Sequence, residues 1–150
     1  MAEARPSAPD VVCAIAAGEQ AGEIVYRDDQ LIAFLDHHPL FKGHVLVCPV
    51  QHIGTLPELP AGLVAPLFTL VQRFSTAVVD GLGADGSFTG INTVISQSVP
   101  HLHVHVIPRR KGDGLRGFFW PRDRYAEGEA AEYAARLRAA LGTGSRAGRG

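Results

Sequence analysis

The chain has 150 residues, a formal net charge of −1 and a hydrophobic content of 46%, which is ordinary for one compact domain with a single core. Lysine and arginine do not cluster along an expected helix face, and this argues against a nucleic-acid partner. Two cysteines far apart in the sequence, no apolar run near the ~20 residues of a membrane span and no signal-peptide pattern favour a cytoplasmic protein that contacts no membrane.

The first half of the chain predicts a short helix, a hairpin and a further strand. Apolar residues recur at helical spacing and stop at Gly18, while the hairpin strands are joined by a turn at Asp28 and Asp29. In chain order, these elements are a helix over 11–16, strands over 24–26 and 31–35, and a strand over 44–48 that ends at Pro49.

The second half contains the longest apolar stripe, which begins after Pro57 and Pro60 and predicts the main helix, packed on the sheet and ending at the glycines at 81 and 83. The remaining elements are strands over 88–95 and 101–108 and an alanine-rich helix over 125–141. Sequential strands with helices grouped outside them predict an α+β fold, an antiparallel sheet with one long packed helix and short terminal helices.

Domain organisation follows from the same pattern. We expect a single domain over residues 10–141, between a flexible N-terminus at 1–9 and a flexible tail at 142–150, because both ends are rich in small residues and lack apolar periodicity.

Residues 101–107, His-Leu-His-Val-His-Val-Ile, are the most informative segment, because their alternation places three imidazoles on one face of a strand. Three histidines on one face would cost too much desolvation to serve packing alone. Together they offer a nucleophile, a proton donor and contacts to an anion. In this interpretation the central His103 attacks phosphorus, and water later hydrolyses the phosphorus–nitrogen intermediate. The other ring nitrogen of His103 then needs an acceptor, most simply a backbone carbonyl.

The same histidines also suggest a zinc hydrolase. Two histidines two residues apart on a strand, with a third ligand, make a common metal site, and His44 or His52 would be the third ligand here.

With these residues, the chain resembles the histidine-triad (HIT) family of nucleotidyl hydrolases and transferases, in its bacterial nucleotide-binding (Hint-like) branch. The family signature is His-φ-His-φ-His-φ-φ, where φ is apolar. The resemblance covers about residues 12–109 and includes Gly-His-Val-Leu-Val-Cys-Pro at 43–49 and Gln-Ser-Val-Pro-His at 97–101. It implies the HIT-like fold, a variable C-terminal region at 110–141, and a homodimer whose two sheets join through the long helix and a central strand.

The resemblance also implies the site residues. His103 matches the nucleophile, and three further histidines surround the phosphate where charge grows in the transition state: His101, His105 and His44. The substrate-binding positions are Phe34 with Leu31 or Ile32 at the base, Asp36 at the ribose, and Asn92, Gln97 and Ser98 near the phosphate.

Two departures from the family pattern concern the loop before the triad and the metal. The loop at 93–96 is short and has no glycine, so its backbone should be stiffer. Many bacterial members carry Cys-x-x-Cys as half of a structural zinc site, and here Asp10 stands at the first position. Asp10, Cys13, His52 and His101 offer mixed ligands, but we expect the site to be lost and no metal to be bound.

For function, the resemblance implies hydrolysis or transfer at the α-phosphorus of a nucleotide conjugate: a phosphoramidate, an adenylate or a dinucleoside polyphosphate. The product is a nucleoside monophosphate such as AMP, and no cofactor is required, although some relatives use magnesium with polyphosphates. Two other hypotheses remain: a non-catalytic purine-nucleotide sensor or scaffold with Phe-Phe-Trp at 118–120 as its partner surface, and a zinc hydrolase built on His101, His103 and His44.

Overall fold

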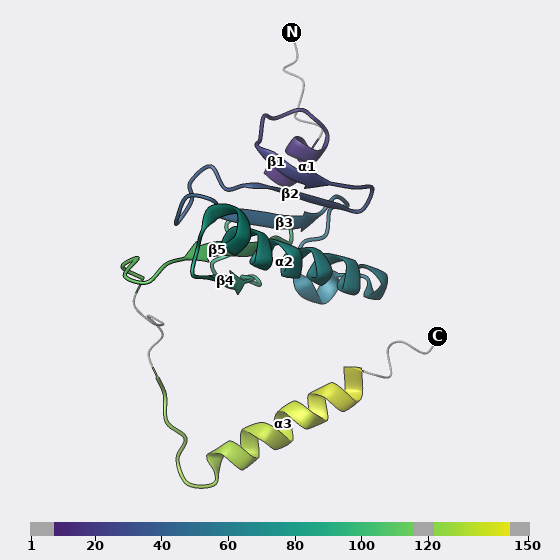
Figure 1. Ribbon diagram of the computed structural model, residues 1–150. Coiled ribbons are helices and arrows are strands. Elements are labelled where there is room, and N and C mark those ends of the chain that lie inside the picture. Colours follow the sequence, from purple (N-terminus) through teal and green to yellow (C-terminus); the bar gives the residue numbers. More distant parts are fainter. Residues whose placement is uncertain (1–7, 116–121, 145–150) are drawn as a thin grey trace. The chain divides into compact units, whose positions relative to one another are not determined.

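The computed structural model describes residues 8–115 and 122–144 (Figure 1). The chain divides at Asp113 into two compact units, each described by itself below. The expectation of one domain over 10–141 stays a prediction. Residues 1–7, the partner surface expected at 118–120 and the tail from 145 onward lie outside the described residues.

The first unit contains a five-stranded sheet in the order β1-β2-β3-β5-β4, in which every neighbouring pair is antiparallel. Its elements are α1 (Val11–Ala16), β1 (Ile24–Arg27), β2 (Leu31–Leu35), β3 (Val45–Pro49), the 3-10 helix η1 (Leu56–Glu58), α2 (Ala61–Leu82), β4 (Gly86–Gly90) and β5 (Val104–Arg109). The second unit contains α3 (Glu129–Gly144). The predicted α+β fold, an antiparallel sheet with one long helix and a short N-terminal helix, is confirmed. The C-terminal helix α3 has 16 residues and is longer than the short helix expected.

Strand alternation divides the core into two layers, one on each face of the sheet. On one face, alternate residues such as Ala33, Val47 and Val104 pack with the buried side of α2, which contacts β3, β4 and β5. Figure 1 shows α2 lying across this face. On the other face, the intervening residues Phe34 and Cys48 pack with α1. The α1 face is therefore the one toward which the even-numbered residues of β2 and β3 point.

Several element boundaries differ from the prediction. β4 covers Gly86–Gly90 rather than 88–95, and beyond it Val94 and Ser96 have φ angles of 67° and 61°, which an extended strand does not adopt. β5 begins only at Val104, so His101 and His103 precede the strand instead of lying in it. α3 begins at Glu129 rather than at 125, after Gly128, which has a φ of 77°.

One stretch of α2 passes a composition test for a membrane span. An 18-residue window of this 22-residue helix reaches a mean hydropathy of 1.4, so by length and composition alone the helix could cross a membrane. Arg73 and Asp80 interrupt its apolar runs, as expected from a sequence without an uninterrupted apolar run near 20 residues. Leu67 and Leu70 are buried against the sheet, as in the core helix of a folded domain.

Candidate functional site

The register of the sheet places one residue from each of three strands in a row across the α1 face. Phe34 on β2 pairs with Leu46 on β3, and Leu46 pairs with His105 on β5. Because adjacent strands lie about 4.8 Å apart, the row spans roughly 10 Å. It forms the floor of a pocket of about 830 Å³.

The pocket brings together five of the predicted site residues: Phe34, Asp36, Ser98, His103 and His105. Its other walls come from residues that the sequence analysis did not select, chiefly Val11, Val12 and Ile15 of α1 and Leu46 of β3. The alternation of β3 could have identified Leu46, because it is two residues from His44 and is therefore expected to point to the same face. Nothing in the sequence pattern places α1 against this face.

Three predicted substrate-binding residues lie elsewhere. Ile32 is fully buried in the core beneath the pocket, and Asn92 is exposed and absent from the described pocket lining. The amide of Gln97 is engaged within the protein: its Nε2 donates to the Gly54 carbonyl at 2.7 Å, and its Oε1 accepts from the Val94 N–H at 3.0 Å. Gln97 therefore holds the short loop before the triad.

Hydrogen bonding selects the tautomer of His103. Its Nδ1 lies 2.7 Å from the backbone carbonyl of His101. A carbonyl only accepts, so Nδ1 carries the proton, and in the neutral ring Nε2 keeps a free lone pair. The acceptor expected from the sequence is thus present, and His103 lines the pocket.

His44 and His105 form a directional chain behind the nucleophile. The Leu40 N–H donates to His44 Nδ1 at 3.2 Å, so the proton of the neutral His44 ring lies on Nε2. His44 Nε2 lies 2.9 Å from His105 Nδ1 and donates to it. The His105 proton is then on Nε2, which makes His105 a hydrogen-bond donor to a ligand in the pocket.

Burial keeps both rings of this chain neutral. It lowers the pKa of His105 to about 4, with His103 and His44 adding to the shift and Asp36 opposing it. Burial also lowers the pKa of His44, again opposed by Asp36, whose Oδ2 lies 3.8 Å from His44 Nδ1. The site therefore offers neutral imidazoles at pH 7 from these two positions.

The shift of His105 predicts a pH dependence of stability. An unfolded histidine has a pKa near 6.5, so between pH 6.5 and 4 the unfolded chain binds more protons than the folded one. The contribution of the neutral ring is complete above pH 6.5 and is lost as the pH falls toward 4. Because His105 is only partly buried, we expect a loss of roughly 2 kcal/mol.

Denaturant unfolding between pH 8 and pH 4 measures this loss. The free energy of unfolding of His105→Gln should vary less with pH in that window than that of the wild type. His37→Gln, at an exposed position, should show the wild-type dependence on pH. An equal slope for His105→Gln and the wild type would contradict the assignment.

A second polar cluster adjoins the first histidine of the triad. Asp10, Cys13, His52 and His101 each offer a ligand atom, and all four atoms lie within 4.8 Å of one another. His101 is fully buried, and its Nε2 donates to the Pro49 carbonyl at 2.8 Å. Its Nδ1 faces Asp10 Oδ2 at 3.1 Å. A neutral imidazole has one proton, so this contact between two acceptors needs either a second proton or a metal cation.

This donor set fits a zinc ion, and the expectation that none is bound stays a prediction. An ion held by Asp10, Cys13, His52 and His101 would have four protein ligands, as structural zinc sites do, and would tie α1 to the sheet without taking part in the reaction. Burial, together with Asp10, raises the pKa of the Cys13 thiol to about 11, so a thiolate ligand forms here only with a cation to stabilise it.

Asp10→Cys tests the departure from the family pattern. The change creates two sulfur and two nitrogen donors, which zinc prefers to the present mixed set. We expect zinc affinity to rise at least about tenfold over the wild type, measured by competition with a chromogenic chelator. Asp28→Cys, in a turn of the same sheet, is the control for an added thiol. Equal affinities of Asp10→Cys and the wild type would show that position 10 is no ligand.

The alternative zinc hydrolase on His101, His103 and His44 is not assembled. Among the described residues, the second group of possible ligands consists of Asp36, His44 and His105. In that group the two imidazoles already satisfy each other through the 2.9 Å hydrogen bond. His101 belongs to the Asp10 cluster, and His103 belongs to neither group.

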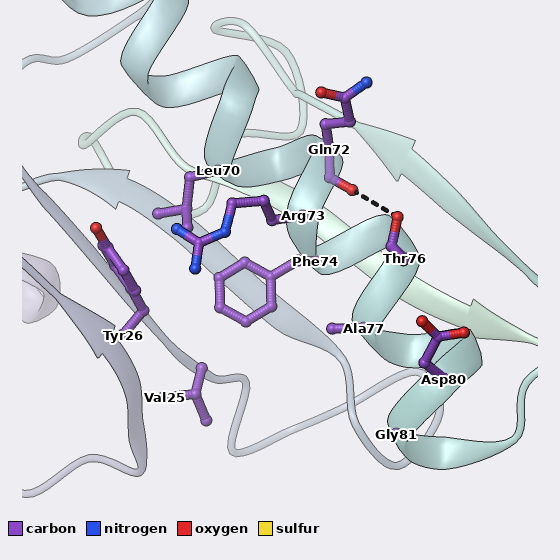
Figure 2. A pocket seen from close by; sticks show the side chains of 10 residues that line it. All are labelled: Val25, Tyr26, Leu70, Gln72, Arg73, Phe74, Thr76, Ala77, Asp80 and Gly81. Atoms are coloured by element: carbon purple, nitrogen blue, oxygen red, sulfur yellow. Dashed lines mark hydrogen bonds between the residues drawn. The ribbon is translucent and has the colours of Figure 1, made fainter.

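A further hollow of about 750 Å³ lies on the opposite face, between β1 and α2. Figure 2 shows Tyr26 of β1 facing Arg73 and Phe74 of α2. The Arg73 guanidinium carbon lies 5.4 Å from the centre of the Tyr26 ring. None of the residues lining this hollow lines the histidine pocket, so the two sites are separate.

Comparison with known proteins identifies relatives of this chain. Adenylylsulfatase HINT3 of Arabidopsis thaliana is 36% identical over 107 residues, which cover 70% of this chain and 54% of that protein. Bis(5'-nucleosyl)-tetraphosphatase [asymmetrical] of Schizosaccharomyces pombe is 36% identical over 93 residues, 61% of this chain and 51% of that protein. The chain thus spans about half the length of these two relatives.

Among solved structures, a Zn-bound histidine triad family protein from Mycobacterium smegmatis is 38% identical, with a TM-score of 0.68, over 94% of this chain and 97% of that one. The HIT domain model matches residues 17–112. That match includes the whole sheet and all three triad histidines, so the chain belongs to the HIT domain family.

Proposed function

We propose that the protein cleaves a nucleotide conjugate at its α-phosphorus, by hydrolysis or by transfer of the nucleotidyl group. The reaction passes through a covalent nucleotidyl intermediate on His103. The observation that carries this proposal is the tautomer of His103, whose Nδ1–H is bound by the His101 carbonyl and whose Nε2 lone pair is free. The family includes nucleotide hydrolases, among them the adenylylsulfatase and the tetraphosphatase named above.

In the first step, the Nε2 lone pair of His103 attacks the α-phosphorus, a phosphorus–nitrogen bond forms, and the bond to the leaving group breaks. The Nε2–H of His105 donates to a phosphoryl oxygen while negative charge grows there. Ser98, at the same pocket, lies near the leaving group. The charge that appears on the His103 ring is stabilised by its 2.7 Å hydrogen bond to the His101 carbonyl.

In the second step, water attacks phosphorus and the phosphorus–nitrogen bond breaks, which frees His103 and releases a nucleoside monophosphate such as AMP. The base lies against Phe34 and Leu46, and the carboxylate of Asp36 binds the ribose hydroxyls. The ~10 Å row from Phe34 to His105 matches the distance from a base to its α-phosphate.

Trapping the adduct tests the proposal. The protein is mixed with adenosine 5'-phosphosulfate, adenosine 5'-phosphoramidate or diadenosine tetraphosphate, quenched at alkaline pH, and digested for mass spectrometry. We expect the peptide containing His103 to carry one added AMP group. Turnover without an adduct on any histidine would overturn the covalent mechanism. AMP binding without turnover of any of the three would instead favour a nucleotide sensor.

We further propose a cytoplasmic homodimer in which the two sheets join. β4 is an edge strand of the sheet, and edge strands are the places where a second copy of a chain can extend a sheet. On α2, Val64, Phe68 and Val79 are 44%, 38% and 38% exposed, which gives the helix a second apolar side. The proposed reaction requires no cofactor, and magnesium would bind only together with polyphosphate substrates.

A further inference from the structure

The two carboxylate oxygens of Asp10 serve two different parts of the candidate site. Oδ1 accepts the backbone N–H of Cys13 at 2.8 Å and so caps α1, the helix that walls the pocket. Oδ2 lies 2.7 Å from His52 Nδ1 and 3.1 Å from His101 Nδ1. The Asp10 side chain is only 2% exposed, so these contacts, with the Cys13 thiol at 3.5 Å, constitute its surroundings.

From Oδ2 a continuous path leads to His103. Asp10 Oδ2 lies 3.1 Å from Nδ1 of the buried His101 ring, and the Pro49 carbonyl accepts from its Nε2 at 2.8 Å. Contacts at both nitrogens restrict rotation of the ring about its side-chain bonds. The carbonyl of that same residue accepts the Nδ1–H of His103 at 2.7 Å. The held ring and the carbonyl that selects the His103 tautomer thus belong to the same residue, and a contact that restrains His101 restrains both.

We propose that Asp10 is a positioning residue for His103, acting through the ring and carbonyl of His101. The inference rests on the proposed function, in which His103 is the nucleophile. Asp10 touches no substrate, and its Oδ1 and Oδ2 act independently: one sets the wall of the pocket, and the other sets the tautomer of the nucleophile. The two roles can be separated because a serine retains a helix cap but has no second oxygen.

Asp10→Ser and Asp10→Ala make this separation. Both variants lose the Oδ2 contacts, but only serine keeps the cap, so Asp10→Ala should melt roughly 3 °C below Asp10→Ser. Both variants lose Oδ2, so both should lower kcat about 10- to 100-fold with little change in KM, as loss of an orienting partner does. A role in capping alone predicts wild-type kcat for Asp10→Ser.

Nitrogen-15 NMR of the imidazoles gives a readout that is independent of turnover. In the wild type, His103 should show a protonated Nδ1 and an unprotonated Nε2, and Asp10→Ser should shift part of the population to the other tautomer. Asp28→Ser is the matched control, since Asp28 accepts the N–H groups of Gln30 and Leu31 in a turn of the same sheet. Spectra are recorded after chelation and again with zinc, so that loss of a metal ligand is distinguished from loss of a hydrogen bond.

A shifted tautomer with lowered kcat in both Asp10 variants, seen in the chelated protein, supports the proposal. Unchanged His103 signals and unchanged kcat in Asp10→Ser would overturn it, as would an effect present only with zinc. If the wild type forms no nucleotidyl adduct, the proposed function fails, yet the NMR comparison still decides whether Asp10 sets the tautomer of His103.

Discussion

Replacing His103 with alanine is expected to lower turnover about a thousandfold or more while leaving nucleotide binding intact. In the proposed mechanism the ring supplies the attacking nitrogen, and the neighbouring His105 is not equivalent to it. The Nδ1 of His105 accepts from His44, and its Nε2 carries a proton. In the proposed binding mode, other groups that line the pocket hold the nucleotide, namely the apolar wall at Phe34 and the carboxylate of Asp36.

Turnover of adenosine 5'-phosphoramidate and AMP binding by calorimetry measure the two halves of this prediction. Gln72→Ala, on α2 at the separate hollow, is the control for handling and should match the wild type in both. Retention of more than about a tenth of wild-type turnover by His103→Ala would reject His103 as the nucleophile. Loss of AMP binding in parallel with turnover would point instead to a collapsed pocket.

Periodicity was sufficient to predict the fold because most elements bury one face. The apolar stripe of α2 packs on one face of the sheet, and the alternating residues of β2 and β3 divide between the core layers on its two faces. The boundaries that failed lie where backbone conformation overrides side-chain pattern. Residues 91–95 read as a strand by composition, but Val94 adopts a left-handed φ of 67°, which a β-branched residue rarely does.

The candidate site was only partly accessible from sequence. The triad alternation predicted that His103 and His105 face one way, and both line the pocket. The alternation alone did not indicate that His101 lies in a buried cluster with Asp10, 91 positions away. The family resemblance did, because it grouped Asp10 and His101 with Cys13 and His52 as possible ligands. Gln97 was assigned to the phosphate by resemblance, whereas its amide is engaged with Gly54 and Val94, which lie in two different loops.

The tautomer chain through His44 leads to the second large effect. His44→Leu removes the donor to His105 Nδ1, so the His105 proton is no longer directed to Nε2, and the donor to the phosphoryl oxygen is lost in part of the population. General-acid and donor contributions of this kind are worth about a hundredfold in kcat. We expect His44→Leu to lower kcat by about that factor.

His44→Gln is the matched variant, because the glutamine amide N–H can occupy the position of the imidazole Nε2–H and donate to His105 Nδ1. It should retain kcat within about tenfold of the wild type, well above His44→Leu. The side chain at position 44 is only 6% exposed, so leucine, an apolar side chain of similar size, can occupy this buried space. Equal losses in the two variants would show that His44 contacts the phosphate itself, because only then would an amide fail to replace it.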